Sequence, residues 1–380
     1  MQLRTDPRKV SYSPRVSSWM RLLWIVLAIC VATQIPSAAA EPESYPVRII
    51  PVPHPITSLL RAEVVRLELA LSPFQIRRIN EAVGEVDLPL WRLRDLPPAQ
   101  RNEQAEPLIR GLEAGLSQIL SARQLERLNQ IARQAEGIGV VLKPEIVERL
   151  NLSTAQAGDI AAVLGASYEK LTTLQSNGEM LDDTRRAAYA LKLRAKTERN
   201  VLTVLSGHQQ RTVNMLMGLP FDLSRIRVTA CKAPEFEAGI WLNSPALKMS
   251  DLSGKVTVIH FYAFGCGNCV RTLPFYNVWR RQFPAENFRI VGIHRPETQR
   301  ERQIEEVREK AAEARMEYPI AIDNESLNWD AWANCVWPSI YLVDKNGFVR
   351  YWWYGELNWQ GAESEKYIRG KIEQLLKEES

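Results

Sequence analysis

The chain has 380 residues, of which 46% are hydrophobic and 24% charged, so its composition is that of a globular protein and excludes a wholly disordered chain. This length suffices for two domains with additional flanking segments. The formal net charge is only +4, and no cluster of lysine and arginine with interleaved aromatic residues occurs, so we expect no nucleic-acid binding.

The N-terminal segment, residues 1–40, has the pattern of an export signal. A basic leader is followed by an apolar core at 22–32 and by small residues at 36–40. This order predicts a secretory signal peptide that is cleaved after Ala40, and hence a periplasmic or other extracytoplasmic location. An uncleaved anchor is one alternative, although a spanning helix needs about 20 apolar residues. Lipidation at Cys30 is another, which the bulky Ile29 before it disfavours.

Residues 41–56 are rich in proline and predict an extended linker. From 57 to 221 the composition becomes helical, and the pattern Leu-Ser-x-x-Gln occurs four times, beginning at Leu71, Leu120, Leu152 and Leu205. A serine just before an apolar run can cap a helix. The first and third copies lie 81 residues apart and the second and fourth lie 85 apart, which predicts a helical domain of two tandem units.

These repeats resemble those of small helical periplasmic proteins of the Spy and CpxP type, which are stress-related chaperones. The resemblance rests on a short motif, and a capped helix start accounts for the same residues without any function. We therefore interpret the repeats as a scaffold, with a chaperone-like or dimer-forming role as the alternative. The segment contains no cysteine, and its histidine, His208, is expected to face solvent.

From residue 228 to 380 the pattern changes to that of an α/β domain. Buried strands are predicted at 256–262 and 288–293, and a charged helix at 300–316. Strands at 340–343 and 348–352 are joined around Asn346-Gly347, which is a strong hairpin signal. An amphipathic helix at 363–376 ends the chain. This order of elements predicts a sheet covered by helices on both faces.

Cys266 and Cys269 lie where the strand at 256–262 ends and a helix begins. Free backbone N–H groups and the helix dipole favour a thiolate at this position. The spacing of three puts both sulfurs on one side of the first turn, where they can form a disulfide. We expect Cys266 to attack a substrate disulfide and Cys269 to resolve the mixed disulfide, with Gly267 and Asn268 at the substrate surface.

Two other readings of this cysteine pair are half of a zinc site and an inert structural disulfide. Zinc needs four ligands, and the remaining candidates are scattered along the chain at Cys231, Cys335, His260 and His294. No metal and no cofactor are therefore expected.

The run from His260 to Cys269 resembles the strand, active site and helix of the thioredoxin superfamily, and Pro274 matches the proline in that helix. Trp337-Pro338 resembles the family's cis-proline loop. The resemblance implies a cis peptide bond there, and a loop that packs beside the two cysteines and pairs with substrate backbone.

More of the C-terminal segment supports a particular branch of that superfamily. The segments 233–236 and 252–255 resemble the TlpA/ResA-like and AhpC/TSA branch. The stretch 260–356 is similar to the C-terminal domain of DipZ proteins and to NHL-repeat-containing thioredoxin-like proteins. The expected fold class is therefore an α/β thioredoxin-like fold at the C-terminus, preceded by an all-α repeat domain.

The resemblance implies an exported thiol–disulfide oxidoreductase that reduces, or less commonly oxidises, disulfides in exported proteins. Its electrons would come from a membrane protein of the CcdA type. A peroxidase of the AhpC/TSA type is an alternative, but peroxiredoxins have a threonine where this chain has Ala263. A non-enzymatic chaperone or binding protein that acts through the helical repeats is the third hypothesis.

Departures from the family pattern leave some roles open. Gly265 replaces the tryptophan that thioredoxins place before the first cysteine. His260 stands where thioredoxins bury an acid, and it could handle the proton of Cys269 or be a core histidine. Cys335, just before the cis-proline loop, could be a third redox thiol, could pair with Cys231, or could be a buried thiol.

Overall fold

The computed structural model describes residues 52–176 and 183–379. The expected signal peptide, and the expected linker up to residue 51, lie outside the described residues. Within them, the chain divides into a helical unit that ends at Ala230 and an α/β unit that starts at Cys231. Among these residues, no helix has the length and apolar character needed to cross a membrane.

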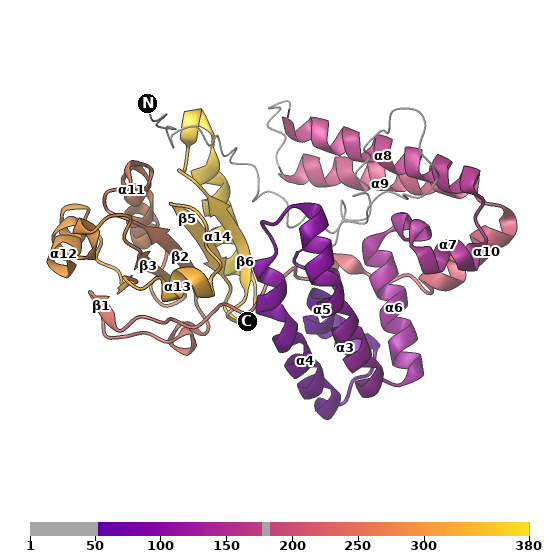
Figure 1. Ribbon diagram of the computed structural model, residues 1–380, viewed down its shortest axis with the longest axis horizontal. Coiled ribbons are helices and arrows are strands. Elements are labelled where there is room, and N and C mark those ends of the chain that lie inside the picture. The colour runs from indigo at the N-terminus through magenta and orange to yellow at the C-terminus, as the bar shows by residue number, and fades with distance from the viewer. Residues whose placement is uncertain (1–51, 177–182, 380) are drawn as a thin grey trace, which may run out of the picture. The chain divides into compact units, whose positions relative to one another are not determined.

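The helical unit contains two hydrophobic cores that follow one another along the chain. Core residues of the first lie between Val52 and Ala135, and those of the second between Ile138 and Leu216. A long helical hairpin dominates each half, α4 with α5 in the first and α8 with α9 in the second (Figure 1). The helices are α2 (Pro55–Arg61), α3 (Glu63–Glu68), α4 (Pro73–Arg92), α5 (Pro98–Ile119), α6 (Ala122–Glu136), α7 (Pro144–Leu150), α8 (Thr154–Ser176), α9 (Asp183–Val204) and α10 (Gly207–Met217).

The four Leu-Ser-x-x-Gln motifs start helices α4, α6, α8 and α10. In the first motif Ser72 caps α4, and the side chain of Gln75 accepts a hydrogen bond from the Ser72 backbone N–H at 3.0 Å. The second and fourth motifs form the same reciprocal capping box. In the third, Ser153 and Gln156 exchange the corresponding two bonds. The sequence pattern is thus a set of helix starts.

The glutamines of the motifs also join the motifs in pairs. The Gln75 amide nitrogen donates to the carbonyl of Ile119, where α5 ends, at 3.0 Å, and to the Gln124 amide oxygen at 2.9 Å. Gln124 reciprocates by donating to the carbonyl of Leu69, just before the first motif, at 3.0 Å. Gln156 and Gln209 form the same arrangement in the second half. Each glutamine side chain therefore accepts from a backbone N–H at the start of one helix and donates to a backbone carbonyl at the end of another. Such terminal backbone groups have no partner within their own helix.

The α/β unit is built on a six-stranded sheet with strand order β1-β4-β3-β2-β5-β6. Strands β2, β3 and β4 run parallel, and the other neighbours are antiparallel. The strands are β1 (Ile240–Leu242), β2 (Val256–Tyr262), β3 (Phe288–His294), β4 (Ile320–Ile322), β5 (Ser339–Val343) and β6 (Val349–Tyr354). The helices are α11 (Gly267–Gln282), α12 (Ile304–Glu313), α13 (Leu327–Ala331) and α14 (Ser364–Lys377).

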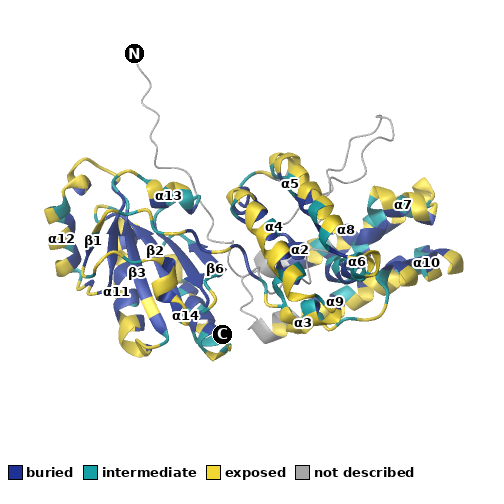
Figure 2. Cartoon of the chain, turned by 90° about the horizontal axis from the view of Figure 1, so that it is seen from below, coloured by how far each residue is buried: buried dark blue, intermediate teal, exposed yellow. Residues whose placement is uncertain are grey.

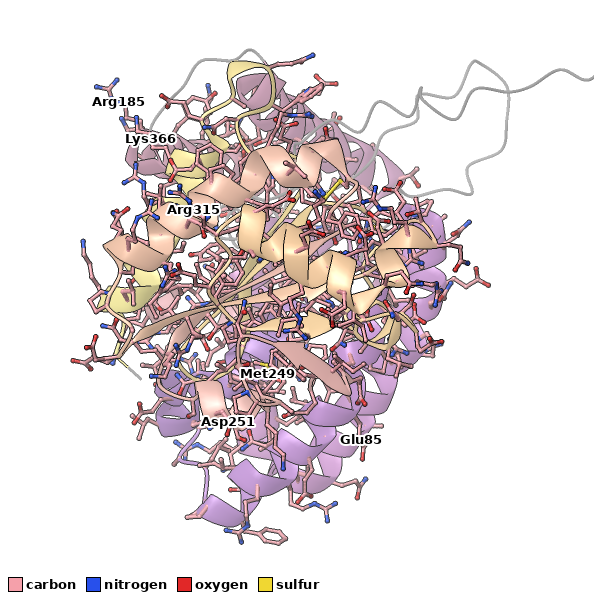
Figure 3. The ribbon with its side chains drawn as sticks, turned by 90° about the vertical axis from the view of Figure 1, so that its left-hand side faces the viewer. Glu85, Arg185, Met249, Asp251, Arg315 and Lys366 are labelled. Carbon is pink, nitrogen blue, oxygen red and sulfur yellow. A yellow bond between two sulfur atoms is a disulfide. The ribbon has the colours of Figure 1, made fainter. Side chains whose placement is uncertain are left out.

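Helices cover both faces of the sheet, in which every residue of β2 and of β5 is buried (Figure 2). On one face His260 of β2 stacks on Tyr276 of α11, and Trp279 of α11 donates to Glu365 of α14. On the other face Phe261 meets Trp329 of α13. Charged side chains such as Arg315, after α12, and Lys366, on α14, are exposed and point outward (Figure 3).

The predicted elements of this unit are confirmed, with shifts at their ends. The hairpin around Gly347 forms with a φ of 77°, which glycine adopts without steric cost. The helix predicted at 300–316 is wrong at both ends, because residues 300–302 form a separate 3-10 turn and α12 spans only Ile304–Glu313. Strands β1 and β4 have three residues each, which is too short for a periodic pattern in the sequence to predict them.

Candidate active site

Cys266 and Cys269 form a disulfide at the point where β2 leads into α11, with their Cα atoms 5.2 Å apart. Cys266 is the N-cap of α11, and the backbone N–H of Cys269 donates to its sulfur at 3.3 Å. The two cysteines differ in access, because Cys266 is half-buried whereas Cys269 is only 1% exposed. An incoming thiol or disulfide can therefore reach Cys266 and not Cys269.

Pro338 lies at the same end of the sheet as the disulfide. The Trp337–Pro338 peptide bond is cis, as the sequence predicted. The next residue, Ser339, pairs with Phe261 near the end of the neighbouring strand β2, which continues to Cys266. The carbonyl of Pro338 accepts a hydrogen bond from the Gly355 backbone N–H at 2.8 Å, which ties the loop to the end of β6. The register of β2 and β5 thus brings the proline loop and the cysteines to the same end of the sheet.

Trp337 belongs to an aromatic and cationic cluster beside this loop. Its ring lies 4.4 Å from that of Trp329, and the Arg295 guanidinium lies 4.8 Å and 4.9 Å from the Trp337 and Trp329 ring centres. Arg295 follows β3, and its Nε donates to Ser326 at 3.1 Å. A guanidinium held over two indoles is preorganised, because both contacts limit its rotamers. Trp329 is a member that the sequence did not indicate.

The two residues between the cysteines are exposed, as expected of a substrate surface. Asn268 accepts a hydrogen bond from Arg271, which also forms a bidentate pair with Glu356 at 2.9 Å and 2.7 Å. A methyl group on Gly267 would lie 3.3 Å from the same guanidinium. This side of the active-site rim is therefore held by Arg271.

His260 lies in the aromatic core of the sheet. It is fully buried, stacks on Tyr276 at 4.0 Å, and its Nε2 lies 3.1 Å from the Tyr318 hydroxyl. Burial lowers the pKa of His260 to about 3, so the imidazole is neutral at pH 7 and is a weak base. These observations favour the core histidine over the proton-handling role.

Cys231 and Cys335 cannot pair with each other in this fold. The Cys231 carbonyl accepts a hydrogen bond from the backbone N–H of Val349, at the start of β6. Cys335 precedes β5 at the opposite end of the hairpin, where Ser339 pairs with Tyr354, the last residue of β6. The length of the β5–β6 hairpin separates them, and a disulfide needs Cα atoms within about 7 Å. Of these two residues Cys231 is buried, whereas Cys335 is exposed, so the buried-thiol alternative for Cys335 is wrong and Cys335 stays a candidate third redox thiol.

Glu301 is a residue of the site that sequence reasoning missed. It lies in the 3-10 turn between β3 and α12 and is 1% exposed, and its Oε1 accepts the Gly265 backbone N–H at 2.6 Å. The sequence placed it in a charged surface helix, where a buried carboxylate is not expected. The one available signal was Gly265, where the family has a tryptophan.

No group of three or more histidine, cysteine, aspartate or glutamate side chains is placed to hold a metal ion within residues 52–176 and 183–379.

The model of the AhpC/TSA family matches residues 229–352, the stretch that carries the disulfide, the proline loop and most of the sheet. The α/β unit belongs to the thioredoxin superfamily. Within it the matches support the TlpA/ResA-like branch.

Two relatives and one solved structure are each similar to part of the chain. Protein DipZ of Mycobacterium bovis is 36% identical over 127 residues, which are 33% of this chain and 18% of DipZ. Thiol-disulfide oxidoreductase YkuV of Bacillus subtilis is 29% identical over 115 residues, 30% of this chain and 77% of YkuV. The crystal structure of thioredoxin-like superfamily protein SPOA0173 matches 39% of this chain and 98% of its own, with 28% identity and a TM-score of 0.36.

This chain thus spans less than a fifth of the length of DipZ, and the stretch that the family model matches begins at residue 229, after α10, the last α-helix of the helical unit.

Proposed function

We propose that the chain is an exported thiol–disulfide oxidoreductase that reduces disulfides in exported proteins through Cys266 and Cys269. The observation that supports it most is the unequal exposure of a disulfide at a helix N-terminus. Cys266 is half-buried and accepts the Cys269 N–H, whereas Cys269 is buried beneath it. An accessible nucleophile with an adjacent, protected second thiol is what a two-step exchange needs.

The reaction starts from the dithiol form. The Cys266 thiolate attacks one sulfur of a substrate disulfide, and the other substrate sulfur leaves as a thiolate. Cys269 then loses its proton and attacks the Cys266 sulfur of the mixed disulfide, which releases the second substrate thiolate. Two electrons pass to the substrate and the Cys266–Cys269 disulfide forms. A membrane dithiol donor of the CcdA type would return the enzyme to its reduced form.

Binding of the substrate chain is assigned to the loop at Pro338 and to the neighbouring surface of Trp337, Gly267 and Asn268. The loop ends at β5, which pairs with β2 just before the cysteines. Ala263, the residue three positions before Cys266, is buried and has no hydroxyl, unlike the threonine of peroxiredoxins. For this reason we do not favour the peroxidase alternative, although the family model covers AhpC-type proteins.

The first test is the redox equilibrium of residues 41–380 with glutathione, with the Cys266–Cys269 disulfide followed by mass. A potential near or below about −270 mV, the thioredoxin value, would identify a reductant, and one near about −120 mV an oxidant of folding proteins. If no reversible disulfide forms at any glutathione ratio, the enzyme proposal is wrong and the function lies with the helical repeats.

A second test separates the two cysteines. The Cys269→Ser variant should accumulate mixed disulfides with exported proteins, because the resolving thiol is missing, and Cys266→Ser should form none through this site. Trapping by Cys266→Ser at the level of Cys269→Ser would contradict the assignment of Cys266 as the nucleophile.

A further inference from the structure

Glu301 is a buried carboxylate with an unusual set of partners. Its Oε2 accepts the backbone N–H groups of Glu297 and Thr298 at 2.7 Å each and the Thr298 hydroxyl at 3.1 Å, and its Oε1 accepts the Gly265 N–H at 2.6 Å. An ionised carboxylate is an acceptor only, so four donors suit it. All four donors are uncharged groups. Glu301 therefore brings a negative charge next to the active-site loop, and none of its four hydrogen-bond donors carries a positive charge.

Three of these bonds shape the turn that carries Glu301, and the fourth crosses to the active-site loop. Gly265 is the residue immediately before Cys266, and it is 36 positions away from Glu301 in sequence. This single bond thus joins the loop before the nucleophile to the segment after β3. A lost bond at this place would free the loop and would leave a buried carboxylate oxygen without its partner.

The glycine at position 265 follows from the same contact. A Cβ atom at this position would lie 2.7 Å from Glu301 Oε1 and 3.4 Å from its carboxyl carbon. Any larger residue, including the tryptophan of thioredoxins, would displace the carboxylate. The absence of a side chain at Gly265 therefore leaves the space that the Glu301 carboxylate occupies.

His294 shows the electrostatic effect of this carboxylate on its surroundings. Burial lowers the pKa of His294 to about 4, while the charge of Glu301 acts in the opposite direction and raises it. Because burial dominates, His294 is neutral at pH 7 and does not neutralise Glu301. The charge of Glu301 also acts on Cys266. Glu301 Oε1 lies 2.6 Å from the backbone nitrogen of Gly265, and the covalent chain from that nitrogen to the Cys266 sulfur is short, so the carboxylate and the sulfur lie within about 10 Å of each other.

We propose that Glu301 is a positioning residue that holds the loop before Cys266 and, through its charge, opposes formation of the Cys266 thiolate. This rests on the proposed function and deepens it. Stabilisation of the thiolate favours the reduced protein and makes a more oxidising disulfide, so a nearby negative charge has the reverse effect. Glu301 thereby biases the Cys266–Cys269 pair toward donating electrons.

The test is the pH profile of iodoacetamide alkylation of Cys266 in reduced residues 41–380. With Glu301→Gln, the midpoint of the profile should fall by about half to one pH unit, from the Coulomb energy of a charge some 10 Å away. At a pH above the midpoint, the glutathione equilibrium should shift by about three- to tenfold toward the reduced protein, which is the factor that corresponds to a fall of half to one unit in the thiol pKa. The matched control is Glu305→Gln, which removes an exposed carboxylate at the start of α12 and should move neither value.

The sign of the midpoint shift separates a charge effect from a structural one. If Glu301 only held the loop, its replacement would misalign the helix N-terminus and the midpoint would rise or stay. Gly265→Ala is a second variant, which displaces the carboxylate without removing it, and its midpoint should fall by a smaller amount. A rise or no change in a folded variant overturns this proposal. A wild-type protein without a reversible Cys266–Cys269 disulfide instead refutes the proposed function.

Discussion

The glutamine pairs of the helical unit make a quantitative prediction for Gln124→Ala. This side chain accepts from the Ser121 backbone N–H and donates to the Leu69 carbonyl, both at 3.0 Å, and its amide also pairs with that of Gln75. At roughly 1 kcal/mol for each of these bonds, the gross loss is about 3 kcal/mol. The site is partly buried, so water replaces some of it, and alanine regains roughly 0.4 kcal/mol of helix propensity. We expect a net loss of about 2 kcal/mol.

The assay is urea unfolding of residues 41–380 followed by far-UV circular dichroism, which reports mainly on the helical unit because most long helices lie there. The matched control is Gln118→Ala on α5, an exposed glutamine, which should change stability by less than about 0.5 kcal/mol. A double-mutant cycle with Gln75→Ala should give a coupling of about 1 kcal/mol for the shared amide bond. If Gln124→Ala behaves like Gln118→Ala, the glutamine network does not stabilise the unit, and the repetition of the motif along this chain needs another explanation.

Two further predictions concern the α/β unit. The pKa of His260 is lowered by burial to about 3, below its unfolded value near 6.5, so the unfolded chain binds the proton first and stability is lost as pH falls from about 6.5 toward 3. His260→Phe should therefore reduce the slope of the unfolding free energy against pH by about 1.4 kcal/mol per pH unit between pH 4 and 6, as measured by acid unfolding. An unchanged slope would mean that His260 is charged in the native state at these pH values. Trp337→Ala removes one of the two indoles that hold Arg295, and should lower kcat/KM for a protein disulfide by about tenfold, a loss of roughly 1.4 kcal/mol. Its glutathione equilibrium should match that of the wild type, and an equal loss with a small aromatic disulfide would show that Trp337 does not contact the substrate protein.

The sequence alone determined the elements and residues whose signals are local. The seven-residue apolar run of β2, the helix start after Cys266 and the Asn346-Gly347 turn each depend on neighbouring residues, and the structure contains all three. The Leu-Ser-x-x-Gln motifs are local in the same sense, because a capping box needs only four residues. The resemblance carried by the Trp337-Pro338 pair likewise predicted the cis bond.

Only the tertiary structure decided what depends on residues far apart in the chain. It paired Gln75 with Gln124, separated Cys231 from Cys335 by the length of a hairpin, and placed Trp329 beside Trp337. It also buried Glu301 against Gly265, although its neighbours in sequence are charged and exposed. A single sequence reports how each segment prefers to fold, whereas burial and the partners of a polar group are properties of the packed chain.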